Sequence, residues 1–76
     1  MLTFDRNQVH LVDEVRRMRH QAGTGSTNWR EIGRRLARQR GIFTVWRCDD
    51  TMVVYTRDGD KVRQQSFGPK TWRFAA

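Results

Sequence analysis

The side chains that could act in catalysis or bind a metal ion are few in this sequence and lie far apart. Cys48 is the only cysteine, and the carboxylates of Asp49 and Asp50 beside it disfavour the thiolate form that a nucleophile needs. His10 and His20 lie ten residues apart on an expected helix, roughly 280° around its axis, so they do not converge on a metal ion. The sequence therefore predicts a protein that is not an enzyme and that uses no metal, no cofactor and no small-molecule substrate.

Positive charge is the strongest feature of the composition. The chain carries 15 Lys and Arg against 8 Asp and Glu, a net charge of +7, and 13 of these cations are arginines. Residues 16–40 contain eight of the arginines and a single acid, Glu31, so this segment accounts for the whole excess. A basic segment of this kind favours an anionic partner.

The arginines fall mainly on one face of a helix expected over residues 29–40. At 100° per residue, Trp29 and Leu36 lie on one side of that helix, and Arg34 and Arg38 lie on the opposite side. The alternative interpretation is a solvated arginine face that only keeps a small protein soluble. The candidate partner-binding residues are Arg30, Arg34, Arg35, Arg38 and Arg40 on this helix, with Trp46 and Tyr55 on the strands that follow.

Capping signals predict two helices in the first half of the chain. Asp5 is a typical capping residue for a helix that begins at Arg6, and Gly23 is placed to end that helix. Asn28 is placed to cap the second helix, over residues 29–40. The glycine-rich connector between the helices resembles a phosphate loop, but it lacks the lysine of that motif and follows a helix instead of a strand. Capping therefore explains the connector better than phosphate binding does.

From Ile42 onward the pattern changes to that of β-strands, rich in Val, Thr and aromatic side chains. Asp49-Asp50 and Asp58-Gly59 are turn signals, and the second pair is among the strongest signals for a two-residue hairpin. The expected strands cover residues 43–48, 52–57 and 61–67. The predicted fold class is therefore α+β, with two N-terminal helices packed on a three-stranded antiparallel β-meander.

Two-residue turns at both positions predict which side chains share a face of this sheet. They place Tyr55 opposite Val62 and Trp46 opposite Val53, which leaves both faces of the sheet half apolar. The two helices can cover only one face. The other face is expected to meet a partner or the C-terminal tail, residues 69–76, which either docks there or stays loose.

Length and composition set the domain organisation and the expected compartment. A chain of 76 residues predicts a single small basic domain over residues 1–76. The longest apolar run, Met52 to Tyr55, is far too short to span a membrane, and the start of the sequence lacks a signal-peptide pattern. A single cysteine excludes an intrachain disulfide and suits a reducing compartment. We therefore expect a soluble, cytoplasmic protein that does not contact membranes.

Three segments carry a resemblance to a known class of proteins. They are the opening LTFDRNQVHL at residues 2–11, the arginine-rich second helix, and the strand segments GIFTVW at 41–46 and YTRDGD at 55–60. This general plan resembles small phage-encoded proteins that bind bacterial RNA polymerase, block initiation and promote antitermination. The resemblance implies a small non-enzymatic regulator that binds bacterial RNA polymerase, or another host nucleoprotein, in the host cytoplasm and inhibits or modifies transcription.

The alternative function is direct binding of DNA by a winged-helix-like domain. In that arrangement the helix over residues 29–40 lies in the major groove through its arginine face, and the hairpin at Asp58-Gly59 acts as the wing. Two features argue against it. The expected fold has no third helix, and Asp58 and Asp60 place acids at the wing tip, where a phosphate-binding wing carries Lys or Arg.

Overall fold

The computed structural model describes residues 1–21 and 29–76. The expected caps Gly23 and Asn28, together with the connector between them, lie outside the described residues. In chain order the elements are β1 (Leu2–Phe4), the 3₁₀ turn η1 (Arg6–Gln8), β2 (Val9–Leu11), α1 (Val12–Gln21), α2 (Trp29–Arg40), β3 (Ile42–Trp46), β4 (Met52–Asp58), β5 (Lys61–Phe67) and β6 (Trp72–Phe74).

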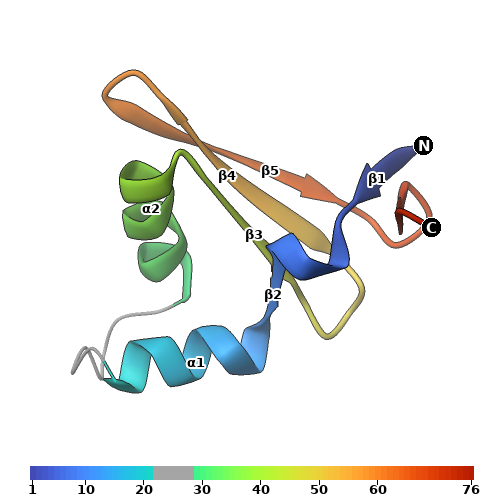
Figure 1. Cartoon of the computed structure of the whole chain (residues 1–76), viewed down its shortest axis with the longest axis horizontal. Helices are drawn as coiled ribbons and strands as arrows, with labels where there is room; N and C mark the ends of the chain where they lie inside the picture. Colours follow the sequence, from blue (N-terminus) through green and yellow to red (C-terminus); the bar gives the residue numbers. More distant parts are fainter. Residues whose placement is uncertain (22–28) are drawn as a thin grey trace.

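The chain is α+β, but the predicted arrangement of two N-terminal helices on a three-stranded meander is wrong. The main sheet has four strands in the order β2-β3-β4-β5 and is mixed, because β2 runs parallel to β3 while the other pairs are antiparallel. A second sheet consists of β1 and β6, which pair in parallel. Two strands therefore precede the helices, and Figure 1 shows the first and last segments of the chain side by side.

The helix predicted to begin at Arg6 is replaced by one 3₁₀ turn and a strand. Asp5 does cap this turn, because its Oδ1 accepts a hydrogen bond from the Asn7 backbone N–H at 2.9 Å. The chain then becomes extended at Val9, and residues 9–11 pair with residues 44–46 of β3. Pairing with a strand far along the chain thus overrides the local capping signal, and α1 begins only at Val12.

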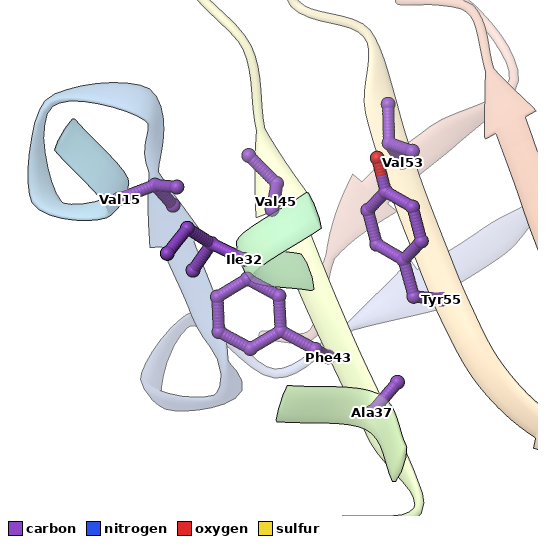
Figure 2. Packing of buried hydrophobic residues seen from close by; sticks show 7 residues of the cluster. All are labelled: Val15, Ile32, Ala37, Phe43, Val45, Val53 and Tyr55. Atoms are coloured by element: carbon purple, nitrogen blue, oxygen red, sulfur yellow. The ribbon is translucent and has the colours of Figure 1, made fainter. Parts of the chain in front are cut away.

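Helix α2 spans the predicted residues and packs closely on the sheet. It ends at Gly41, which has a φ of 94° and whose backbone N–H donates to the Ala37 carbonyl at 2.7 Å. Ile32, Gly33 and Ala37 are the buried residues of this helix. Together with side chains of α1, β3 and β4 they enclose the main core, whose buried members are Val15, Ile32, Ala37, Phe43, Val45, Val53 and Tyr55 (Figure 2).

The β4–β5 hairpin turns one residue later than predicted. Asp58 pairs with Lys61, so the turn residues are Gly59 and Asp60, and Tyr55 lies opposite Gln64 instead of Val62. Gly59 has a φ of 64° at the first turn position, where type II′ turns place glycine. The hairpin itself was expected, and only its register differs.

The β3–β4 connection changes which side chains share a face. Trp46 pairs with Met52, not with Val53, so the predicted register is shifted by one residue. Because strand side chains alternate, this shift moves every residue of one strand to the other face relative to its partner. Val45 and Val53 consequently lie side by side toward the helices, whereas Trp46 and Met52 lie on the opposite face.

The opposite face of the main sheet is covered by the two ends of the chain. Trp72 of β6 is 9% exposed, and its ring lies edge-on to the rings of Phe4 and Trp46, with centroids 5.9 Å away in both cases. Phe4 also packs on Phe67 of β5, and Phe74 packs on Trp46. The C-terminal segment therefore docks on the sheet through Trp72 and Phe74, one of the two outcomes left open by the sequence.

Candidate nucleic-acid interface

The groups considered for catalysis or metal binding lie at ordinary structural positions. Cys48 is exposed in the β3–β4 connection. The His10 ring stacks on Phe43, with centroids 4.6 Å apart, and its Nδ1 lies 3.4 Å from a carboxylate oxygen of Glu14. Among residues 1–21 and 29–76, no three His, Cys, Asp or Glu side chains gather to hold a metal ion, and no helix has the length and apolar character of a membrane span.

Helix α2 presents five exposed arginines. Because Ile32, Gly33 and Ala37 face the sheet, the flank and outer side of the helix are left to charged side chains. The hydrophobic period of α2 therefore positions Arg30, Arg34, Arg35 and Arg38, whereas Arg40, about 20° around the axis from Trp29, lies in the last turn on the apolar side and is nevertheless exposed. We call Arg30, Arg34, Arg35, Arg38 and Arg40, all exposed, the α2 arginine face.

Several arginines outside α2 have structural partners. Arg47 lies 3.7 Å from a carboxylate oxygen of Asp49, and Arg63 lies 3.1 Å from Asp58. The guanidinium carbon of Arg6 lies 4.1 Å from the centroid of an aromatic ring of β6, a cation–π contact. These arginines hold together turns and the packing of the two chain ends.

Within the described residues, the α2 arginine face has one contact of this kind, between Arg30 and the ring of Trp29, with the guanidinium carbon 5.9 Å from the ring centroid. Within the described part of the chain, none of its five arginines takes part in an ion pair. Arg38 and Arg40 lie in the last turn of α2, where their charge also favours the negative end of the helix dipole. The arrangement can therefore neutralise a row of negative charges brought to it by a partner.

The β4–β5 hairpin lies beside the C-terminal end of α2 (Figure 1). Arg57 joins the two elements, since its Nη1 donates to the Arg38 carbonyl at 3.0 Å and so satisfies a carbonyl in the last turn of the helix. The tip of the hairpin carries Asp58 and Asp60 beside Lys61, and Asp58 already binds Arg63. The hairpin thus braces the helix and adds little positive charge to the surface.

Tyr55, predicted to bind a partner, lies inside the main core. Its side chain is 0% exposed, and its ring packs against Gly33 and edge-on to Trp29, with ring centroids 6.2 Å apart. Burial raises the pKa of the Tyr55 phenol, while the charges of Arg30 and Arg34 partly oppose this shift. This placement removes Tyr55 from the surface that a partner could contact.

Trp46, the other predicted strand residue, is half-buried on the opposite face of the sheet. Its indole Nε1 donates to Asp50 Oδ1 at 3.1 Å, and Trp72 Nε1 donates to the Asp50 backbone carbonyl at 2.9 Å. Asp50 holds both indoles from a left-handed backbone conformation, with a φ of 62°. Trp46 therefore belongs to the packing of the chain ends, and it does not lie with the α2 arginine face.

Trp29 packs against the main core, as the sequence pattern predicts, and its exposed part makes it a candidate contact residue as well. It is half-buried at the start of α2, and the guanidinium carbons of Arg30 and Arg47 lie 5.9 and 5.5 Å from its ring centroid. An aromatic ring beside arginines is a combination that binds nucleobases by stacking. Side-chain alternation along β3 is the signal that could have found Arg47, because this residue lies two positions after Val45, just beyond the end of the strand, and its guanidinium reaches Trp29 on the same face as Val45.

Comparison with known proteins adds no relative to this description. No family model matches the chain, and neither a curated protein nor a solved structure matches it. The function is therefore argued from the α2 arginine face and its surroundings.

Proposed function

We propose that the protein binds nucleic acid directly through the α2 arginine face, in the cytoplasm. The observation that carries this proposal is the concentration of exposed arginines on one helix, since α2 presents five of them, whereas Arg16, Arg17 and Arg73, exposed arginines that also lack an ion pair among the described residues, lie on α1 and β6. Arg47, Arg57 and Arg63 have partners in the fold, whereas the exposed arginines of α2 form no ion pair among the described residues. Neutralising phosphates releases counterions, which favours binding without any further apolar contact.

Binding of bacterial RNA polymerase, the function implied by the resemblance, is the second candidate. A basic helix also suits an acidic protein surface. An apolar protein interface on the sheet, however, needs one face of the sheet to be uncovered. Trp72, Phe4 and Phe74 occupy the face that the helices leave open, so the α2 arginine face would have to carry this interaction too.

The salt dependence of binding to a labelled DNA duplex tests the proposal. Four or five arginine–phosphate contacts predict that the logarithm of the association constant falls against the logarithm of salt concentration with a slope of about −3 to −5. Fluorescence anisotropy measures this directly. Absence of duplex binding at low salt, together with binding to purified RNA polymerase, would overturn the proposal in favour of the second candidate.

A charge-reversal pair locates the interface. Arg34→Glu with Arg38→Glu should reduce duplex affinity by about tenfold or more. Because two phosphate contacts are lost, the slope of the logarithm of the association constant against the logarithm of salt concentration should become about two less negative. The matched control is Lys70→Glu with Arg73→Glu, which changes the net charge equally on exposed residues at the other side of the sheet. If both pairs weaken binding equally, net charge and not the α2 arginine face determines affinity.

A further inference from the structure

Strand β5 is the long open edge of the main sheet. The order β2-β3-β4-β5 places it last, and among the described residues its seven members pair only with β4. Backbone N–H and C=O groups of alternate residues therefore point away from β4 and lack a strand partner. The strand at the other edge, β2, has only three residues.

This edge lacks several of the features that prevent strands of different molecules from pairing, although Lys61 and Arg63 place two charges on it. The register with β4 runs without a bulge from Lys61 to Phe67, and no proline interrupts it. The side chains from Arg63 to Ser66 are exposed, so no neighbouring element covers them. The charge of Arg63 is offset by Asp58, 3.1 Å away.

We propose that two copies of the chain pair through β5, antiparallel, about a two-fold axis at Gln64. This register uses all seven residues of the strand. It places Gln64 opposite the same residue of the second copy, and the remaining pairs are Lys61 with Phe67, Val62 with Ser66 and Arg63 with Gln65. In this register no two like charges lie directly opposite each other. This matters because like charges in opposite positions destabilise strand pairing, and each chain has a net charge of +7.

The dimer deepens the proposed function and, in this respect, rests on it. Antiparallel strands of one sheet are related by a two-fold axis perpendicular to that sheet, so the same face of both copies points to the same side. Helix α2 packs on one face of β3 and β4, and both copies of α2 consequently lie on one side of the joined sheet. The two arginine faces then form a two-fold symmetric basic surface, which suits duplex nucleic acid.

Sedimentation equilibrium without nucleic acid tests the dimer separately from the function. The wild-type chain should show concentration-dependent dimerisation. Gln64→Glu and Gln64→Lys should each weaken the dimer by about tenfold, because each places two like charges opposite each other. An equal mixture of the two variants should recover dimers, because a carboxylate then faces an ammonium group.

A control variant and three contrary results define the test of the β5 dimer. Thr3→Glu, on an exposed residue of β1, is the matched control and should leave dimerisation unchanged. A wild-type chain that stays monomeric would overturn the proposal, and a dimer that tolerates Gln64→Glu would place the interface elsewhere. Failure of the mixture to form dimers would exclude the register at Gln64. Since no DNA is present, any of these results leaves direct nucleic-acid binding to be judged by its own titration.

Discussion

At the residue scale, the contact between Gly33 and Tyr55 sets how closely α2 approaches the sheet. A Cβ atom added at Gly33 would lie 2.7 Å from Tyr55 Cε2 and 2.8 Å from its Cδ2. The tyrosine ring is fully buried, so it has little room to move aside. Gly33 is therefore required by a close approach of helix and strand, and this contact fixes the height at which the α2 arginine face stands above the sheet.

Gly33→Ala should lower the free energy of unfolding by about 1–3 kcal/mol, because the added methyl group overpacks the core. Chemical denaturation measures the change. The control is Gly68→Ala, since a Cβ at Gly68 meets no atom within 4 Å. Equal stability of Gly33→Ala and the wild type would show that α2 can move away from β4 at little cost.

At the scale of elements, the two hairpins differ in how their turns set the register. The β3–β4 connection closes with hydrogen bonds from the Asp50 N–H to the Arg47 carbonyl at 3.0 Å and from the Arg47 N–H to the Thr51 carbonyl at 2.9 Å. With Asp50 in the left-handed region, this is the three-residue loop with a bulge, which adds one residue to a two-residue turn. That extra residue reverses the faces of β3 relative to the predicted sheet.

Gly59→Val tests the turn between β4 and β5. Nothing lies within 4 Å of a Cβ built at Gly59, so the expected loss comes from its φ of 64°, which a β-branched residue resists. We expect a cost of about 1–2 kcal/mol, seen as a fall of about 4–8 °C in Tm for each kcal/mol. Gly68→Val, at a glycine without a positive φ, is the comparison. If the two variants have the same Tm, Gly59 does not occupy the turn position assigned to it.

At the scale of the whole molecule, the sheet separates two apolar layers. The helices cover one face, and the aromatic side chains of β1 and β6 pack on the other. Trp72 connects this second layer to the β3–β4 connection through its hydrogen bond to the Asp50 carbonyl. The first and last residues of the fold thus complete a core that the middle of the chain cannot close alone.

Trp72→Ala should therefore destabilise the whole fold, by about 3–5 kcal/mol, since it removes a large buried ring. Arg73→Ala, at an exposed neighbour in the same strand, should change stability by less than about 0.5 kcal/mol. Thermal unfolding followed by circular dichroism compares the two. A Trp72→Ala protein as stable as the wild type would mean that the chain ends contribute no core.

Features that depend on local periodicity were predictable from the sequence. The 3.6-residue pattern of α2 separates an apolar face from an arginine face, and the structure places Ile32 inside and Arg34 outside as expected. Gly41 ends this helix with a φ of 94°. The candidate site on α2 could be predicted from the sequence because all of its residues lie on one helix, whose period places most of them.

Features that depend on pairing between distant segments were not predictable in this way. Asp5 signals a helix locally, yet the residues that follow it pair with β3 instead. Trp72 donates a hydrogen bond to the carbonyl of Asp50, 22 positions away in the chain. Tyr55 was assigned to a partner-binding surface because one extra residue in a loop decides which face a strand presents. Register, strand partners and the burial of aromatic side chains depend on the free energy of contacts between distant segments, which no local pattern contains.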